Sequence, residues 1–560
     1  MAFRKRKSKG TAEVPLCLFV WRTGVEKKEV YAGSLRTGVL LLTVANLLVK
    51  VLGFLYKVPL NAILGDEMAN VNAAAALFAL LYTVTAAGIP GALAVSVSRA
   101  RAVGDGARIR VLLSSTLRLL LAVGFFASVA VLLLAHPISH ESGDGGAYLC
   151  TLAIAPALFF VSLTGVLRGF FQGFSSLMPT AVSEILEALG KVGFGVLLAL
   201  LSLRVLGRTE ASAAAFAVFG ITLGVIMGAV YLALLYRRRA RGMLSSVGWG
   251  RDLPSCTSRE ARRTVLAVAL PITLSAALLS LSTFIDAQLM RPLLSRYFAD
   301  EALAKALYSD YSTGALTLYN LPLVLVTPIS AALIPYIGGA CAAGEWERAK
   351  GVTGAALKLA SLVAFPSALG LSAFAAPLLS FVFRADGDMA ENAGPLLAVL
   401  ALCVVFSALL TLGCAVLQAA GRERLPIFSL GAGVLVKLVL MRTLVPRMGA
   451  VGVPLSTLGF YAVASLSSLL LLMRCGVLRV RVFDSFVRPL FCAGASVLLA
   501  RMTYTGAYET LGADVSLLLA VVLAALLYLA LLFLLRAVGR EEIALFPYGR
   551  RILRLWDRKK

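Results

Sequence analysis

The chain has 560 residues, a formal net charge of +24 and a mean hydropathy of +0.89, and 59% of its residues are hydrophobic. This composition excludes an ordinary soluble domain. The apolar runs are about 20 residues long, which at about 1.5 Å per residue matches a hydrocarbon core of roughly 30 Å. The arginines and lysines lie in short loops between these runs, as in a polytopic membrane protein, so we expect no nucleic acid partner. The eight cysteines are scattered without a C-x-x-C spacing, so we expect neither a metal site nor a disulfide framework.

An all-α fold with fourteen spanning helices is predicted. In chain order we place them at 36–57, 71–98, 112–135, 148–167, 179–203, 213–236, 264–290, 312–337, 355–376, 393–413, 426–446, 450–473, 486–502 and 514–536. The loops after the second, sixth and twelfth helices are rich in arginine, whereas those after the first, third and ninth carry acidic residues. By the positive-inside rule, both termini are expected in the cytoplasm.

Two segments recur along the chain. The segment that begins at Ile89 aligns with the one that begins at Ile329, so that Gly104 meets Gly344 and Asp105 meets Glu345. Gln172 and Lys191 are nineteen residues apart, as are Gln418 and Lys437. These matches predict two six-helix lobes related by a pseudo-twofold axis along the membrane normal. The predicted divisions are a basic cytoplasmic tail (1–34), an N-lobe (35–236), a cytoplasmic linker (237–263), a C-lobe (264–473), two added helices (474–536) and a basic C-terminal tail (537–560).

Charged residues inside apolar segments are the candidate site. An ionisable group near mid-bilayer costs roughly 2.5–3.5 kcal/mol on insertion scales, so it is expected to face a bundle interior or a cavity. Glu187 and Lys191 stand four apart on one helical face and can neutralise each other. An ion pair that only fixes helix packing is one reading, and a polar transport site is the other. Lys191 and Lys437 lie at about the same depth, roughly 17–18 Å along their helices, so we expect them to face each other across a central cleft.

Further charged and polar residues complete the predicted site. Lys50 lies about 18 Å deep in the first helix. A cationic cavity favours an anionic substrate such as a diphosphate. The predicted substrate-binding residues are Lys50, Lys191, Lys437, Glu187, Gln172 and Gln418. Lys57 is expected at the outer interface, where simple snorkelling is the alternative, and Asp286 is expected near the outer end, paired with Lys57 or Arg291 as an outer gate.

Four stretches resemble a known family. They are KVLGFLYKVPLNAILGDE (50–67), TAAGIPGALAVSVSRARAVGD (85–105), RGFFQGFSSLMPTAVSEILEALGKVGFG (168–195) and VLQAAGRERLPIFSLGAGVLVKLVL (416–440). They resemble the polysaccharide biosynthesis and stage V sporulation protein B branch of the MOP exporter superfamily, which is related to the lipid II flippases. The resemblance implies a twelve-helix core in two lobes with two extra helices, and movement of an undecaprenyl-diphosphate-linked sugar between leaflets. It also places Lys50 where lipid II flippases carry a head-group-contacting arginine.

The resemblance has limits. It begins near residue 33, which leaves open whether the preceding residues belong to the native chain. No basic residue occurs between Lys57 and Arg99, nor within 312–337, where lipid II flippases carry arginines. The fold is therefore expected to transfer better than the substrate.

The first hypothesis is a flippase for a lipid-linked oligosaccharide or peptidoglycan precursor, working by alternating access, with membrane lipids as its other partners and a monomer as the working expectation. The second is a cation-coupled multidrug exporter of the same superfamily that uses Glu187 or Asp286, and the third is a membrane-embedded glycosyltransferase. No P-loop and no catalytic constellation can be placed in one cavity, so we expect a transporter without catalytic residues, cofactor or metal.

Overall fold

The structure is a computed structural model that describes residues 44–84, 88–102, 104–140, 145–245, 247, 257–383, 388–479 and 483–535. Almost all of these residues form helices, and eleven helical stretches are long and apolar enough to cross a membrane. Two of these stretches, Val44–Tyr82 and Leu425–Arg474, each contain two helices joined by a short 3₁₀ turn. The chain is an all-helical, multi-pass membrane protein, and the count of fourteen spans stays a prediction.

The N-terminal half comprises residues 44–245. It contains a helix over residues 44–64, η1 (Gly65–Glu67), α2 (Met68–Tyr82), α3 (Ile89–Ala102), α4 (Gly106–His140), α5 (Gly145–Ile154), α6 (Ala157–Gly173), α7 (Met178–Leu200), η3 (Leu201–Val205) and α8 (Glu210–Ser245). Serine and threonine hydroxyls inside these helices bond to carbonyls of the preceding turn, as Ser162 does to Leu158 O at 3.1 Å. Such bonds satisfy polar groups where lipid offers no partner.

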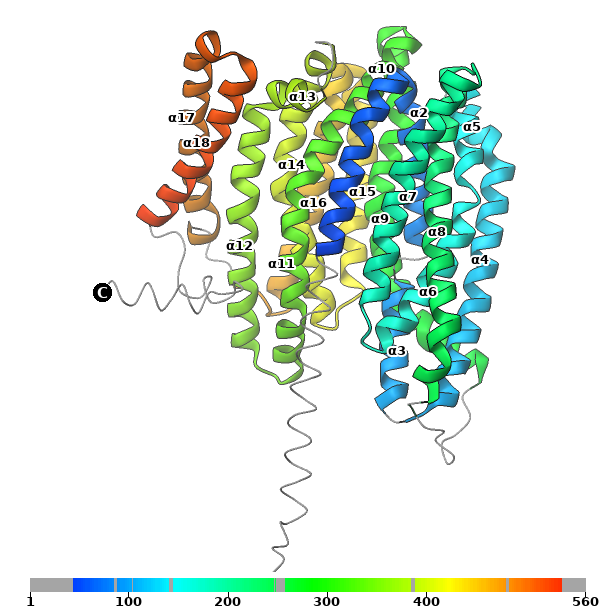
Figure 1. The fold of residues 1–560 in the computed structure, drawn as a ribbon. Helices are drawn as coiled ribbons and strands as arrows, with labels where there is room; N and C mark the ends of the chain where they lie inside the picture. The colour runs from blue at the N-terminus through cyan, green and yellow to red at the C-terminus, as the bar shows by residue number, and fades with distance from the viewer. Residues whose placement is uncertain are drawn as a thin grey trace, which may run out of the picture.

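The C-terminal half comprises residues 257–474, and two further helices follow it. Its elements are α9 (Ser258–Phe298), α10 (Glu301–Asp310), η4 (Tyr311–Ala315), α11 (Leu316–Ala342), α12 (Trp346–Ala373), α13 (Ala375–Phe383), α14 (Asp388–Ala419), α15 (Leu425–Met448), η5 (Gly449–Val451) and α16 (Gly452–Arg474). After η6 (Phe483–Val487), α17 (Arg488–Leu511) and α18 (Ala513–Leu534) pack against each other and against α12 and α13, at one edge of the molecule (Figure 1).

Several predicted boundaries are wrong. Residues 71–98, expected as one helix, form α2 and α3 with a break between them, and residues 148–167 are divided between α5 and α6. The predicted linker begins inside α8, which continues to Ser245, and it ends inside α9. At the α2–α3 break, Gly88 donates its amide to Thr273 Oγ1 at 3.2 Å, and a Cβ on Gly88 would lie 2.5 Å from Ala269 O. This close approach to α9 needs a residue without a side chain.

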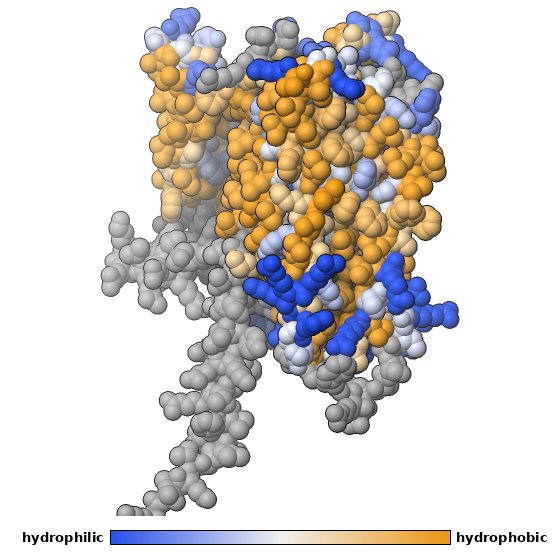
Figure 2. Space-filling view, turned by 45° about the vertical axis from the view of Figure 1, so that its right-hand side comes forward, coloured by the Kyte–Doolittle hydropathy of each residue, from blue (hydrophilic) through white to orange (hydrophobic). Residues whose placement is uncertain are grey.

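The molecule has two polar ends. We call the end that carries Arg99 and Arg237 the basic end, and the end that carries η1 and α10 the distal end. Hydrophobic residues cover the middle of the surface, and hydrophilic residues gather at both ends (Figure 2). This is the surface expected of a protein that lies across a bilayer, with its helices running between the two ends (Figure 1).

The turns at the basic end support the internal repeat. Gly104 and Gly344 both have a φ of 74°, and each is followed by a residue whose amide bonds to a carbonyl five residues earlier at 2.9 Å. A second pair of turns follows Gln172 and Gln418, with Ser175 at φ 62° and Gly421 at φ 73°. Both matches fall at the offsets that the sequence predicts.

The two halves have largely separate hydrophobic clusters, and two of the contacts between them are the following. The largest cluster lies almost entirely in the C-terminal half, and three others lie in the N-terminal half with a few residues of α9. First, α9 packs on α2, α3 and α4 as well as on α10 and α15. Second, at the distal end, α2 and η1 contact α10 and η4.

A seam of glycines joins α7 to α8. A Cβ on Gly190 would lie 2.6 Å from the Cα of Gly224, and one on Gly224 would lie 2.5 Å from Glu187 O. Small residues let membrane helices approach closely, so that packing and backbone contacts hold them together. The seam sets the position of α7, which carries Lys191.

Candidate functional site

A cavity of about 220 Å³ lies between α2 and the C-terminal half. Helix 44–64 and α2 line it from one side, and α9, α10, η4, α11 and α16 line it from the other. Its polar lining residues are Lys57, Asn72, Ser282, Thr283, Asp286, Tyr308, Ser312, Tyr319, Asn320, Thr457 and Tyr461. The cavity is smaller than the roughly 300–1,000 Å³ of ordinary ligand pockets, so in this conformation it has room for only part of a large head group.

Two lysines of the N-terminal half lie close to each other, and one of them lines this cavity. Lys57 lines the cavity and donates from Nζ to the backbone oxygen of Ser312 at 2.8 Å. Its expected place at the outer interface is therefore wrong. Lys191 Nζ lies 4.6 Å from the centre of the Tyr56 ring, a cation–π contact, and its positive charge repels that of Lys57. Neither ammonium forms an ion pair with a described carboxylate.

Lys50 lies on the same helix as Lys57. The two residues are seven apart, or about 10.5 Å along the axis, so they share one helical face. Lys50 is exposed and makes no ion pair with a described residue. This face of helix 44–64 therefore carries one exposed ammonium and, two turns on, one ammonium inside the cavity.

Lys437 does not face Lys191 across a cleft, and that expectation is wrong. Its side chain is completely buried. Nζ donates to Asp286 Oδ2 at 2.8 Å, to Ser282 O at 2.8 Å and to Ser282 Oγ at 2.9 Å. All three ammonium protons are therefore used within the C-terminal half. The pairing occurs because α15 packs on α9, which places an amine and a carboxylate of equal and opposite charge together in an apolar interior.

The predicted pairing of Asp286 with Lys57 or Arg291 is wrong for the same reason, since its ion pair is with Lys437. Arg291 donates from Nη1 to Asn70 Oδ1 at 3.1 Å, which joins α9 to α2 near the distal end. The three residues predicted to form an outer gate do not all lie together. Lys57 and Asp286 line the cavity, whereas Arg291 is not among its lining residues.

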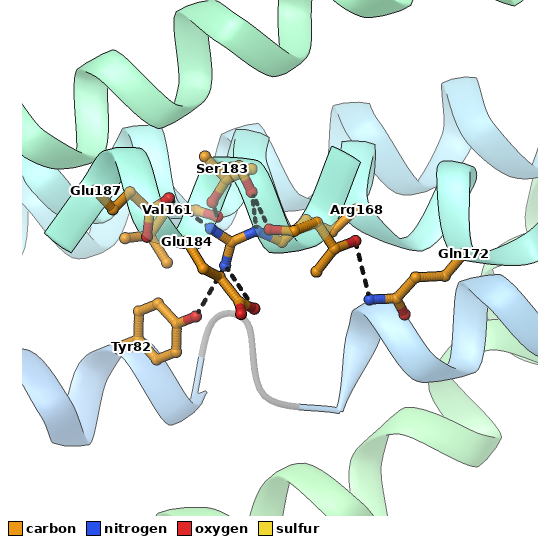
Figure 3. A network of polar contacts seen from close by, with 9 residues as sticks. Tyr82, Val161, Arg168, Gln172, Ser183, Glu184 and Glu187 are labelled. Carbon is orange, nitrogen blue, oxygen red and sulfur yellow. Dashed lines mark hydrogen bonds and ion pairs between the residues drawn. The ribbon is translucent and has the colours of Figure 1, made fainter. Parts of the chain in front are cut away.

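Glu187 pairs with Arg168, not with Lys191 (Figure 3). Arg168 Nη2 lies 2.7 Å from Glu187 Oε1, and Nε donates to Ser183 Oγ at 3.0 Å. Nη1 contacts Tyr82 OH at 3.4 Å and lies 3.8 Å from Glu184 Oε1. A guanidinium presents five donors in a planar fork, so Arg168 can join three helices through one side chain. This network holds α2, α6 and α7 together inside the N-terminal half.

The two glutamines end helices at the basic end. Gln172 donates to Thr180 Oγ1 at 3.3 Å, and the Gln418 carbonyl accepts from Gly421 N at 3.0 Å. Neither residue lines the cavity. Their matching spacing to Lys191 and Lys437 reflects repeated turns, and the expectation that they join the lysines in one site is wrong.

Sequence reasoning missed the uncharged residues of the site. Asn72, Asn320 and Thr457 line the cavity, yet only charged groups and glutamines were considered. An asparagine inside the apolar run 71–98 was the available signal, because an amide in a spanning helix needs a partner as a charge does. Arg168 was missed as the partner of Glu187, although a hairpin at 174–177 brings α6 and α7 side by side.

The cavity can bind an anionic group that also carries hydroxyls. Lys57 supplies a positive charge whose described hydrogen bond is to a neutral carbonyl. Amides, serines, threonines and tyrosines surround it, and these are donors and acceptors for a polyhydroxylated ligand. The intramembrane carboxylates Glu187 and Asp286 each form an ion pair within the protein, so their charges are already balanced by Arg168 and Lys437.

The fold is that of an all-helical, multi-pass membrane protein with a polar cavity between its halves, and comparison with known proteins gives the family. Residues 35–340 match the polysaccharide biosynthesis protein family, and residues 271–442 match the MatE family. The chain belongs to the polysaccharide biosynthesis protein family, within the MOP superfamily.

Individual relatives and a solved structure agree with this assignment. The chain is 23% identical to the lipid II flippase MurJ of Bacillus subtilis (strain 168), over 77% of this chain and 81% of the relative. It is 25% identical to stage V sporulation protein B of the same organism, over 92% and 98%. A structure of lipid II flippase MurJ in an inward closed conformation matches with a TM-score of 0.65 and 15% identity, over 88% of this chain and 98% of that chain. The last similarity shows a shared fold.

Proposed function

We propose that this chain is a flippase that moves an anionic, lipid-linked oligosaccharide or peptidoglycan precursor across the bacterial cytoplasmic membrane. The carrier lipid would be undecaprenyl diphosphate, and alternating access of a site between the two halves would move the head group. Support comes from the family, from the similarity to a lipid II flippase over most of both chains, and from the chemistry of the cavity.

The observation that carries the proposal is the pair of ammonium groups on Lys57 and Lys191. They are close enough for their charges to repel, they lie among apolar helices, and their contacts with described residues are a neutral carbonyl and an aromatic ring. An intramembrane charge without a counter-charge is expensive, and such residues usually mark a substrate pathway. A diphosphate would supply the missing negative charge.

In the proposed mechanism, the diphosphate first meets Lys50 and then reaches Lys57, with Lys191 adding to the positive potential. The sugar lies among the amides and hydroxyls of the cavity, and the prenyl chain stays in lipid. Lys437, Glu187, Gln172 and Gln418 act in packing and turns instead of in binding. Because the cavity is small and the halves touch at the distal end, transport requires the halves to separate there.

The test uses proteoliposomes that contain fluorescent lipid-linked sugars of defined head group. Lys57→Gln and Lys191→Gln should each lower the initial flipping rate by roughly tenfold or more, because each removes a charge-assisted contact of about 1.5–3 kcal/mol. Lys350→Gln is the matched control, since Lys350 is paired with Glu347 at the surface and its loss should leave the rate unchanged.

Flipping at the parental rate by both variants would refute the assignment of the anion site. Drug-resistance profiling in a sensitive host tests the exporter alternative, and resistance conferred without any flipping of lipid-linked sugars would refute the proposed function.

A further inference from the structure

A strip of polar contacts crosses between the halves at the distal end. Asn72 donates from Nδ2 to Ser312 Oγ at 2.9 Å and to Thr313 Oγ1 at 2.7 Å. Near it, Lys305 on α10 pairs with Glu67 on η1 at 2.5 Å. Asn72, Ser312 and Thr313 are all buried, so these hydrogen bonds are shielded from water. We call these contacts the distal strip, together with the bond between Arg291 and Asn70 described above.

The partner of Asn72 is a short π-helical turn. η4 (Tyr311–Ala315) connects α10 to α11, and all five of its residues are buried. π-turns are rare in proteins and often occur at functional sites, because they hold an extra residue within a helix. The Ser312 hydroxyl donates to Tyr308 O at 2.7 Å and so anchors η4 to α10.

Ser312 is held by the N-terminal half twice. Asn72 holds its hydroxyl oxygen, and Lys57 Nζ holds its backbone oxygen at 2.8 Å. Lys57 is also the ammonium that lines the cavity. One residue of η4 therefore connects the cavity cation directly to the contacts that close the distal end.

We propose that Asn72 is a positioning residue that, together with Lys57, latches η4 to the N-terminal half, and that an anion bound at Lys57 weakens this latch. An anionic oxygen is a stronger acceptor than a neutral carbonyl, so it competes with Ser312 O for the ammonium. After that bond is lost, the hydrogen bond from Asn72 is the one of the two that still joins Ser312 to the N-terminal half. The closed distal end therefore becomes less stable. Occupancy of the cavity thereby favours opening at the distal end, which couples binding to movement.

The proposal rests on the proposed function for the identity of the anion, and the latch itself does not depend on it. Asn320 provides a matched control. It lines the same cavity with the same amide group, but it donates within its own half, to Leu316 O at 2.6 Å.

The experiment measures the opening directly by the distance between two spin labels. The full chain, with its eight cysteines replaced by alanine, carries labels at Glu210→Cys and Glu301→Cys, two exposed positions at the distal end of the two halves. Double electron–electron resonance in liposomes reports the distance distribution. Asn72→Ala should raise the ratio of long to short distances by about fivefold or more, since two buried hydrogen bonds are lost, whereas Asn320→Ala should leave the distribution unchanged.

The coupling is tested with farnesyl diphosphate as the probe and farnesol as its uncharged counterpart. Farnesyl diphosphate should raise the long-distance population of the parent protein, farnesol should not, and Lys57→Gln should abolish the response. A purely structural role for Asn72 would produce no such dependence on an anion. If Asn72→Ala does not express, Thr313→Val removes one acceptor of the latch with little change of volume and should give a smaller shift in the same direction.

Two results would overturn the proposal: a distribution for Asn72→Ala that matches Asn320→Ala, or bound farnesyl diphosphate that leaves the parental distances unchanged. The flipping assay distinguishes failure of the latch proposal from failure of the proposed function. Normal flipping with unchanged distances would refute the latch alone, and a normal latch response in a protein that flips no lipid-linked sugar would refute the proposed function alone.

Discussion

At the scale of single residues, the buried charges divide into two kinds. Lys437 and Arg168 each have a carboxylate partner within 2.8 Å, on a neighbouring helix of the same half. Lys57 and Lys191 have none among the described residues. A paired charge contributes to packing, and an unpaired charge beside a cavity is available to a ligand. This difference in pairing, more than depth in the membrane, separates structural lysines from candidate binding lysines.

The Lys437–Asp286 pair leads to a prediction about stability. Lys437→Met should lower the free energy of unfolding by about 3–5 kcal/mol, because it leaves the Asp286 carboxylate buried without a counter-charge. The double variant Lys437→Met, Asp286→Leu should recover most of this loss, since no buried charge then remains. Thermal unfolding in detergent measures both.

Lys350→Met is the control, because its ion pair with Glu347 is at the surface and should contribute about 0–1 kcal/mol. A single variant as stable as the parent, or a double variant no better than the single one, would show that the pair is not what holds this interior.

At the scale of elements, breaks and close contacts decide where the helices lie. The segment predicted as a single helix is divided into α2 and α3, and Gly88, directly before α3, packs against α9. η4 widens the start of α11, where Ser312 meets Lys57. The glycine seam lets α7 and α8 touch along their length, which places Lys191 beside Tyr56. These irregularities therefore decide which helices come into close contact.

The seam gives a test at this scale. Gly224→Ala should destabilise the protein by about 1–3 kcal/mol, because the new methyl group would meet Glu187 O at 2.5 Å and force α7 and α8 apart. It should also lower flipping, since Lys191 moves with α7. Gly193→Ala, on α7 and with open space around it, should leave stability unchanged or slightly raised. Equal unfolding temperatures for the two variants would contradict the close contact.

At the scale of the whole molecule, the charges define an orientation. Arginines gather at the basic end, and the membrane orients such ends toward the cytoplasm. We therefore propose that the distal strip lies at the outer face, which would make this conformation closed on that side. The division into two six-helix lobes, 35–236 and 264–473, stays a prediction that the separate hydrophobic clusters and the repeated turns favour.

Cysteine labelling of intact cells tests the orientation. In a cysteine-free background, Glu301→Cys at the distal end should react with a membrane-impermeant maleimide, whereas Trp346→Cys at the basic end should react only after the membrane is permeabilised. Both positions are exposed, so accessibility is matched and only the side of the membrane differs. The reverse pattern would invert the proposed direction of access.

Much of the fold could be predicted, because the requirement to span a bilayer acts on local sequence. Lipid offers backbone groups no hydrogen-bond partner, so each span must be a helix, and apolar runs, basic loops and the repeat mark the spans in the sequence. The helical class and most helix positions were therefore predicted correctly. The end of α2 at Tyr82 and the interruption at 155–156 were missed, since a glycine or proline in an apolar run predicts a weak point without saying whether a neighbouring helix will pack against it.

The sequence by itself determined an all-helical membrane protein with basic loops, a repeated pair of turns and a small set of buried charges. Only the tertiary structure decided which charge meets which. Helix periodicity places Lys191 and Glu187 on one face of α7, but the ion pairs form between neighbouring helices instead. Glu187 pairs with Arg168, and Asp286 pairs with Lys437. The physical reason is that pairing energies depend on the packing of helices far apart in the chain, so Lys57, which forms no ion pair among the described residues, becomes visible only once the described carboxylates have been assigned.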